Sequence, residues 1–315
     1  MPEKKSTKEV EAFIDISIVI PFYNDEDLIL PLTKRLKEVF SDNQNCEFIL
    51  IDDGSGDDTF GRLSELHKDD NRFHIAGLAR NCGQRRAVTE GMKIARGKVI
   101  ATMDPDLQND PAEIPALAAL VGEKTALVNG VRSKREENLL KRRIPSFITN
   151  KILALITGGK MKDFGSPMAV FTVQLVRETM RLSPSGLFSK TLASMLSNEI
   201  REVPIFQAPR SAGSSSYNFL RLLKMFHFLV FSALELRLVM AGLSPSTIRA
   251  GAFGGSAMNL AGIILTFTMF DRISLLSLML LLLTLLFLSS FMISLKNNKR
   301  LKEEETPVMR SLPPS

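Results

Sequence analysis

Two long apolar runs near the C-terminal end constrain this chain more than any other feature. They cover residues 250–270 and 273–295 of 315, and only Asp271 and Arg272 separate them. Each run has roughly the 20 apolar residues that a helix needs to cross a hydrocarbon core about 30 Å thick. A buried helix of a soluble protein is rarely so long and so free of charge. The runs therefore predict a hairpin of two transmembrane helices.

Basic residues flank the predicted hairpin at both outer ends. Arg237 and Arg249 precede it. Four more follow it: Lys296, Lys299, Arg300 and Lys302. Since cytoplasmic loops carry an excess of Lys and Arg, we expect both chain termini in the cytoplasm. The charged first residues, with no apolar segment soon after them, are unlike a secretory signal peptide. We therefore predict a multi-pass protein of the inner (cytoplasmic) membrane.

Changes in composition divide the chain into five segments. The predicted segments are an N-terminal tail (1–14), a cytoplasmic domain (15–217), interfacial juxtamembrane helices (218–246), the transmembrane hairpin (247–296) and a cytoplasmic tail (297–315). Charges such as Arg221 and Glu235 interrupt the apolar juxtamembrane segment, which favours helices lying in the membrane interface over a third span. The Gly251-x-x-x-Gly255 pattern can pack the hairpin itself or a homo-oligomer. We expect the tail beyond Lys302 to be disordered.

The cytoplasmic segment alternates short β-branched or apolar runs with segments of helical apolar spacing. Strands are expected at residues 15–20, 46–51, 73–78 and 98–103, and helices at 28–40, from 59 onward and at 87–95. Pro21 is expected to end the first strand. This alternation predicts an α/β domain with a mostly parallel sheet and helices on both faces. Ligands of such sheets bind at the carboxyl ends of the strands.

Polar motifs follow three of the four expected strands. They are Pro21-Phe-Tyr-Asn-Asp-Glu26, Asp52-Asp-Gly-Ser55 and Asp104-Pro-Asp106. Because the carboxyl ends of parallel strands meet at one edge, we expect the three loops to form one site. A carboxylate of the second motif can accept from an N–H of a base such as uracil, although the motif also fits a plain Asp-Gly turn. Tyr23 can flank a base or ribose, and a structural role for it stays open.

The pair Asp104 and Asp106 has the pattern of a divalent-cation site. Two carboxylates one residue apart can hold Mg²⁺ or Mn²⁺, which take oxygen ligands and share them with phosphates. The alternative is a helix cap and a solvated acid. Cys46 and Cys82 lack the C-x-x-C spacing, and the three histidines are scattered, so we expect neither a zinc site nor a histidine triad. The chain has two basic clusters, at residues 132–143 and 296–302. Because two membrane spans are predicted, these clusters favour phosphorylated substrates or lipid head groups over nucleic acid as partners.

Four motifs in this order resemble the family 2 glycosyltransferases, which have the GT-A fold. The motifs are Ile18-Val-Ile-Pro-Phe-Tyr-Asn24, Ile51-Asp-Asp-Gly-Ser-Gly-Asp-Asp-Thr59, Arg80-Asn-Cys-Gly-Gln84 and Asp104-Pro-Asp-Leu-Gln108. The chain is most similar to the branch of dolichyl-phosphate mannose synthase and the bacterial undecaprenyl-phosphate glycosyltransferases. That branch's order continues in Gly130-Val-Arg132 with Arg135, Asp163-Phe-Gly165 and Arg210-x-x-Gly213-x-Ser215-x-Tyr217. The likeness, paired C-terminal spans included, covers nearly the whole chain.

The resemblance implies inverting transfer of a single sugar from a nucleoside-diphosphate sugar to polyprenyl (undecaprenyl) phosphate. It implies Mg²⁺ or Mn²⁺ as cofactor and a role in cell-envelope glycan or lipopolysaccharide modification. The implied nucleotide pocket is lined by Pro21, Tyr23, Asp25, Ile51 and Asp53, although the family usually has Glu in place of Asp25. Asp104 and Asp106 would hold the metal and the diphosphate, with Gln108 beside them.

The resemblance also assigns residues beyond the first four strands. Arg132 and Arg135 would contact phosphate, a role that suits the guanidinium fork, unless they are solvated surface charges. Arg210 and Tyr217 would lie on a loop that closes over the donor. Asp163 would be a general base or an anchor for a sugar hydroxyl, and an ordinary helix-terminal Asp is the alternative.

Two positions depart from the pattern of the relatives. Ala169 stands where they commonly have Arg, and Ser216 stands where they commonly have Lys. Losing two cations weakens charge compensation at a diphosphate site unless other groups replace them, and Lys160 and Lys162 are close in sequence. A degenerate membrane scaffold that retains donor binding is therefore an alternative function. A processive polysaccharide synthase is less favoured, because the chain has no Trp and so lacks the Gln-x-x-Arg-Trp motif.

Overall fold

The computed structural model describes residues 14–43, 45–132, 157–159, 161–183 and 186–208, and the backbone of residues 310–311. The predicted interfacial helices and transmembrane hairpin lie outside these residues, as do Arg135, Arg210 and Tyr217. None of the helices within the described ranges has the length and apolar character that crossing a membrane requires.

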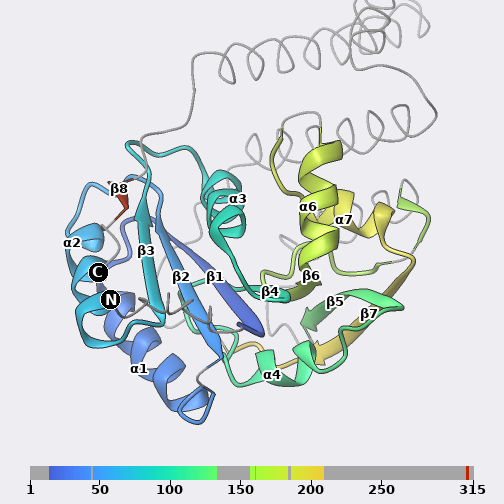
Figure 1. The fold of residues 1–315 in the computed structure, drawn as a ribbon, viewed down its shortest axis with the longest axis horizontal. Coiled ribbons are helices and arrows are strands. Elements are labelled where there is room, and N and C mark those ends of the chain that lie inside the picture. Colours follow the sequence, from blue (N-terminus) through green and yellow to red (C-terminus); the bar gives the residue numbers. More distant parts are fainter. Residues whose placement is uncertain are drawn as a thin grey trace, which may run out of the picture.

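An eight-stranded sheet forms the centre of the domain, with the strand order β7-β5-β6-β4-β1-β2-β3-β8 (Figure 1). The strands are β1 (Ile16–Phe22), β2 (Cys46–Asp52), β3 (Phe73–Gly77), β4 (Val99–Thr102), β5 (Thr125–Arg132), β6 (Ala169–Thr172), β7 (Glu199–Ile205) and β8 (Arg310–Ser311). β1 to β4 are mutually parallel. β6 is antiparallel to both β4 and β5, and β7 is parallel to β5. The carboxyl ends of β1 to β5 and of β7 therefore share one edge.

The four strands expected from the sequence are confirmed, with one correction at Pro21. This residue lies inside β1, which continues to Phe22. β4 ends at Thr102, which pairs with Val19, so β4 has no residue opposite Pro21. Proline has no backbone N–H to donate, and at this position no hydrogen bond to β4 is lost. β1 and β2 are buried along their whole length, which explains their continuous apolar runs.

Helices cover both faces of the sheet, as the sequence predicts. They are η1 (Glu26–Leu28), α1 (Ile29–Val39), α2 (Thr59–Asp69), α3 (Gln84–Ile94), α4 (Glu113–Ala118), α6 (Val173–Leu182) and α7 (Lys190–Leu196). Apolar side chains of α1, α2 and α4 pack into one core layer. Those of α3, α6 and α7 pack into the layer on the opposite face. Figure 1 shows α1 and α4 on one side of the strands and α3 and α6 on the other.

Two residues of the C-terminal tail pair with the sheet, which corrects the expectation that the whole tail is disordered. Arg310–Ser311 form β8 and lie antiparallel to Ala76 and Gly77 of β3. The edge strand of a sheet offers unpaired backbone groups, and an added strand satisfies them. The tail therefore joins the edge of the domain that the N-terminal half of the chain builds.

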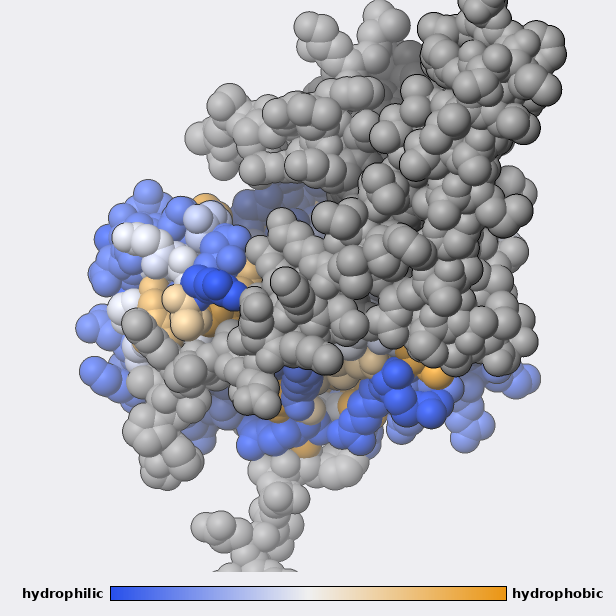
Figure 2. Space-filling model, turned by 90° about the horizontal axis from the view of Figure 1, so that it is seen from above, coloured by the Kyte–Doolittle hydropathy of each residue, from blue (hydrophilic) through white to orange (hydrophobic). Residues whose placement is uncertain are grey.

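The described surface is mostly polar. In Figure 2, hydrophilic residues dominate the visible described surface, and hydrophobic ones form small groups between them. Among the described residues, the exposed large apolar side chains are Tyr23, Leu30, Ile94 and Phe206. Scattered residues of this kind are normal on a globular domain. Tyr23 differs from the other three, because it lies at the carboxyl edge of the sheet beside a pocket.

Candidate functional site

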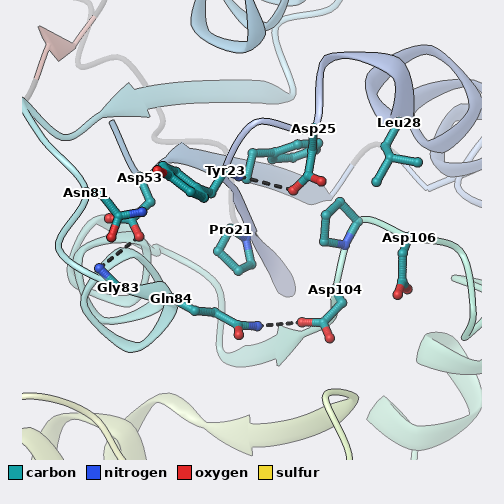
Figure 3. Close-up of a pocket in the computed structure, with 12 residues that line it drawn as sticks. Pro21, Tyr23, Asp25, Leu28, Asp53, Asn81, Gly83, Gln84, Asp104 and Asp106 are labelled. Atoms are coloured by element: carbon teal, nitrogen blue, oxygen red, sulfur yellow. Dashed lines mark hydrogen bonds between the residues drawn. The ribbon is translucent and has the colours of Figure 1, made fainter. Parts of the chain in front are cut away.

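A pocket of about 480 Å³ lies at the carboxyl edge of the sheet, between the ends of β1, β2 and β4 and the start of α3. Its lining residues are Pro21, Phe22, Tyr23, Asp25, Leu28, Asp53, Asn81, Gly83, Gln84, Asp104, Pro105 and Asp106. The three polar motifs that follow the strands thus meet in one cavity. Figure 3 shows the carboxylates around it, with Tyr23 and Asp53 apart from Asp106.

Hydrogen bonds between the first two loops fix the wall of the pocket at Tyr23. Asn24 adopts a left-handed conformation, with φ of 54°, and its N–H donates to Ser55 Oγ at 2.9 Å. The N–H of Tyr23 donates to Asp25 Oδ2 at 3.1 Å, and that of Asp25 donates to Thr59 Oγ1 at the same distance. The Tyr23 side chain is left 47% exposed. Its ring is therefore available to contact a planar ligand group.

Asp53 is the most deeply held carboxylate of the pocket. It is 2% exposed, and its two oxygens accept from the N–H groups of Cys82 and Gly83, each at 2.8 Å. Burial raises the pKa of Asp53 above its usual value, against the effect of these two bonds. Each oxygen retains a second lone pair. Asp53 thus shapes the loop before α3 and can still accept a hydrogen bond from a ligand.

The residue after Asp53 is a glycine for a steric reason. Gly54 has a φ of +68°, and a Cβ atom there would lie 2.3 Å from the backbone carbon of Arg80. Only glycine adopts this conformation at such close backbone approach without strain. The Asp-Gly motif therefore brings the loop after β2 against the loop before α3, which is the contact that Asp53 uses.

Asp104 and Asp106 lie on the opposite wall, after β4. Asp104 Oδ1 accepts from Gln84 Nε2 at 2.6 Å, and Asp106 Oδ1 accepts from the N–H of Gln108 at 3.2 Å. Leu107, between Asp106 and Gln108, has a φ of 53°, which makes the tight turn. The described residues contain no group of three or more His, Cys, Asp or Glu side chains that could hold a metal ion. Two carboxylates suit a cation that also binds substrate oxygens.

Ile51 and Gln108 were assigned to the nucleotide site but lie outside the pocket lining. Ile51 is 0% exposed and packs in the core layer of α3. Gln108 connects the turn after β4 to the segment after β7, because its Oε1 accepts from Gln207 Nε2 at 3.0 Å. Its carbonyl oxygen accepts from the N–H of Ala208 at 2.7 Å. These contacts give both residues a supporting position behind the site.

Arg132 and Asp163 form a second charged group at the same edge, at the end of β5 and before β6. Arg132 donates from Nε to Asp163 Oδ2 at 2.9 Å and from Nη2 to Oδ1 at 2.7 Å. Each side chain is 11% exposed. A Cβ atom on Gly165 would lie 2.8 Å from Arg132 Nη2, so the glycine of the Asp-Phe-Gly motif makes room for the pair.

The ion pair changes the acidity of Asp163. Burial alone would raise the pKa of Asp163, but hydrogen bonds from Arg132 and the charges of Arg132 and Lys190 outweigh it and lower the pKa below its usual value. A carboxylate with a lowered pKa is a weaker base. Asp163 is therefore a weaker base than a free aspartate, and it gives Arg132 a partner within the protein.

Lys190, the first residue of α7, joins this group and was missed by the sequence reasoning. Its ammonium donates to Asn129 Oδ1 at 3.0 Å and to the carbonyl oxygen of Ser166. Burial lowers the pKa of Lys190 to about 8, and the charges of Asp163, Glu202 and Asp104 act against this effect. The one sequence signal is that no other charged residue lies between Arg181 and Glu199.

The lysines suggested as replacements for the missing cations are placed differently. The side chain of Lys162 is exposed, and its backbone N–H donates to Glu202 Oε1 at 2.8 Å. Lys160 lies outside the described residues. Within the described part of the chain, Lys190 is therefore the lysine that reaches the charged group beside β4.

Comparison with known proteins shows similarity in sequence. The profile described as "Glycosyl transferase family 2" matches residues 17–180. The undecaprenyl-phosphate 4-deoxy-4-formamido-L-arabinose transferase of Enterobacter sp. (strain 638) is 31% identical over 224 residues, which cover 70% of this chain and 68% of that protein.

Solved structures that align with this chain do so at lower identity. Glucosyl-3-phosphoglycerate synthase from Mycobacterium tuberculosis, with Mn²⁺, uridine diphosphate and glucosyl-3-phosphoglycerate, gives a TM-score of 0.48 at 18% identity over 74% of this chain and 82% of that chain. A mannosyltransferase from Pyrobaculum calidifontis, with GDP-Man and Mn²⁺, gives a TM-score of 0.43 at 12% identity over 90% of this chain and 87% of that chain.

Proposed function

Since this chain belongs to glycosyl transferase family 2, we propose that it transfers a single sugar from a nucleoside-diphosphate sugar to a polyprenyl (undecaprenyl) phosphate. The observation that carries the proposal is the pocket, which has a different chemistry at its two ends. Tyr23 and the buried Asp53 suit the base and ribose of a nucleotide. Asp104 and Asp106, across the cavity, suit its diphosphate through a divalent cation. The name of the Enterobacter relative includes undecaprenyl phosphate, which supports the choice of acceptor.

The oxygen-only donor set fits Mg²⁺ or Mn²⁺ at Asp104 and Asp106. Such cations are usually held by one or two carboxylates together with substrate phosphates and water. A bound cation would supply charge stabilisation for the departing nucleoside diphosphate. Gln84 and the N–H of Gln108 hold the two carboxylates in place for it, through the bonds at 2.6 and 3.2 Å.

A phosphate acceptor reduces the need for a general base. The second pKa of a phosphate monoester is about 6, so the acceptor is largely dianionic at pH 7 and attacks without losing a proton. Displacement at the anomeric carbon in one step inverts its configuration. The protein then contributes mainly positioning and electrostatic stabilisation. The lowered pKa of Asp163 agrees with this division, and we assign Asp163 to orienting Arg132 and the sugar.

A lipid acceptor requires the pocket to face a membrane. The predicted hairpin supplies an anchor, and the position of β8 bears on how many times the chain crosses the membrane. Arg310–Ser311 pair with β3 in the sheet that carries the pocket. The intervening chain must therefore leave and return to the same side of any membrane that it crosses, which agrees with two spans and with both termini in the cytoplasm.

The test is sugar transfer by the full chain in detergent. Radiolabelled UDP- and GDP-sugars are supplied with undecaprenyl phosphate and Mn²⁺ or Mg²⁺, and the glycolipid is resolved by chromatography. We expect a lipid carrying one sugar with at least one donor, and we expect chelation of the cation to remove it. Products of many sugars would indicate a processive synthase instead. Nucleotide binding without transfer from any donor would favour the non-catalytic scaffold.

A further inference from the structure

Asn129 of β5 lies at a defined place in the sheet, on the same face as the end of β4. Ala169 begins β6 and is 0% exposed. Its Cα partners are Asn129 in β5 and Thr102 in β4. Residues paired across neighbouring strands carry their side chains on the same face of a sheet. The side chains of Asn129, Ala169 and Thr102 therefore share one face.

Lys190 reaches this place from another element. α7 packs on the same face, in the core layer that contains Ala169, and the Lys190 ammonium donates to Asn129 Oδ1 at 3.0 Å. Its second acceptor is the carbonyl oxygen of Ser166. The next residue, Pro167, accepts from Thr102 Oγ1 at 3.1 Å, so this segment lies beside the end of β4. The ammonium thus lies next to the strand that leads into Asp104.

We propose that Lys190 binds a phosphate oxygen of a substrate at the carboxyl edge of the sheet. The proposal rests on the proposed function for the presence of phosphates in both substrates. One phosphate belongs to the donor diphosphate and the other to the acceptor lipid. A cation beside Asp104 is placed to meet either of them.

The other charges of the group leave Lys190 as the cation without an ion pair among the described residues. Arg132 and Asp163 satisfy each other through two bonds. Glu202 Oε1 accepts from the N–H groups of Lys162 and Asp163, at 2.8 and 3.1 Å. Lys190 donates to two neutral oxygens instead. The carboxylates of Asp163, Glu202 and Asp104 act on the Lys190 ammonium from a distance, and no described carboxylate is in direct contact with it. A phosphate in direct contact would offset more of the cost of burying the ammonium.

The competing explanation is purely structural. Lys190 ties α7 to β5 and to the segment before β6, and these two hydrogen bonds alone could account for its presence. The two explanations differ in whether the positive charge at position 190 is needed. Glutamine has two N–H donors for the same oxygens but no charge, and arginine keeps the charge. Substitution by methionine removes both.

The experiment compares Lys190→Met, Lys190→Gln and Lys190→Arg in the full chain. The control is Lys98→Met, which removes an exposed lysine at the opposite edge of the sheet, where it pairs with Asp15. We expect the Met and Gln variants to weaken phosphate recognition about 10- to 100-fold, as for loss of one charge-assisted bond. We expect Lys190→Arg and the control to stay within about threefold of wild type. If Lys190→Gln behaves like wild type, the structural explanation holds and the proposal is wrong.

Two measurements locate the phosphate. Calorimetric titration of UDP and GDP with Mn²⁺ reports the donor side, and the KM for undecaprenyl phosphate at saturating donor reports the acceptor side. A charge-dependent change in either supports the proposal, and no change in both overturns it. If wild type binds a nucleotide but transfers nothing to undecaprenyl phosphate, the proposed function fails and the titration alone decides on Lys190. If Lys190→Met does not fold, the Gln and Arg variants decide.

Discussion

The two halves of the carboxyl edge hold their charged groups in different ways. In the half formed by β1 to β4, backbone N–H groups hold most of the pocket carboxylates, as Cys82 and Gly83 hold Asp53 at 2.8 Å, and the neutral side chain of Gln84 holds Asp104. In the half formed by β5 to β7, side chains hold one another, as Arg132 and Asp163 do. A substitution leaves the backbone N–H donors of a loop in place, whereas a single substitution can remove a charged side-chain partner. We therefore expect side-chain substitutions in the first half to change the free energy of unfolding little, and those in the second half to lower it.

The largest expected effect is on activity in the first half. Asp106→Ala removes one of two carboxylates that suit the cation, and we expect kcat/KM for sugar transfer to fall about 100- to 1,000-fold. Because Asp106 is only partly buried and accepts one bond from Gln108, we expect the melting temperature to be nearly unchanged. The activity is measured with saturating Mn²⁺, and Asp27→Ala, which changes an exposed acid outside the pocket lining, is the control. Equal activity of both variants would refute the cation site.

The second effect is on stability in the other half. Asp163→Ala leaves Arg132 buried without its partner, and loss of one member of a buried pair costs about 3–5 kcal/mol of unfolding free energy. We expect the Arg132→Ala/Asp163→Ala variant to lose much less than the sum of the two single variants. Chemical denaturation of all three measures this. Additive losses would show that the two side chains do not depend on each other.

Acid should weaken the same pair. The pKa of Asp163 is lowered in the folded protein, so its contribution to stability is complete above the unfolded pKa of about 3.9. The contribution is lost as the pH falls through the folded pKa. The Asp163→Ala variant should therefore lose less stability than wild type between neutral and acidic pH. A parallel pH dependence of the two proteins would contradict the ion pair.

The sequence predicted the first half well, because its information is local. Apolar strands followed by Asp53 or Asp104 belong to single short segments, and the turn glycine Gly54 lies beside its carboxylate. The prediction that Pro21 ends the first strand was wrong. β1 extends beyond the end of β4, and a proline there removes no hydrogen bond between the two strands. Ile51 was itself predicted to line the nucleotide pocket, and it lies in the core. A motif predicts which loop forms the site, but the alternation of side chains along the strand determines which of its residues face the ligand.

The second half was predicted less well, because its contacts join distant segments. Lys190 and Asn129 are 61 residues apart, and Arg132 and Asp163 are 31 residues apart. The sequence named Arg132 and Asp163 as separate site residues without predicting that they pair. Lys190 carries no motif, so proximity in sequence favoured Lys160 and Lys162 instead. The roles of Arg135, Arg210 and Tyr217 and the transmembrane hairpin stay predictions.

A third effect concerns pH and sharpens the role of Lys190. Its pKa of about 8 means that it loses its proton as the pH rises through that value, whereas arginine stays protonated. The charged groups around it are Arg132 on β5, Asp163 before β6, Glu202 on β7 and Asp104 after β4. We expect kcat/KM of wild type to fall about tenfold per pH unit above this pKa. Lys190→Arg should shift that decline to higher pH, and an identical profile would exclude titration of Lys190 as its cause.

The smallest expected effect is the most specific, because the experiment moves the positive charge from position 190 to position 169. If a cation on this face of the sheet binds the phosphate, then Ala169→Arg should restore nucleotide or acceptor affinity in the Lys190→Gln variant. Loss of the lysine side chain opens space beside Asn129, on the face that position 169 shares. We expect recovery of about threefold to tenfold, less than the full loss, because arginine must fit into a fully buried position. The same substitution in wild type, where Lys190 keeps the space, should give no gain. A gain in wild type equal to that in the Lys190→Gln background would mean that the two cations act at separate places.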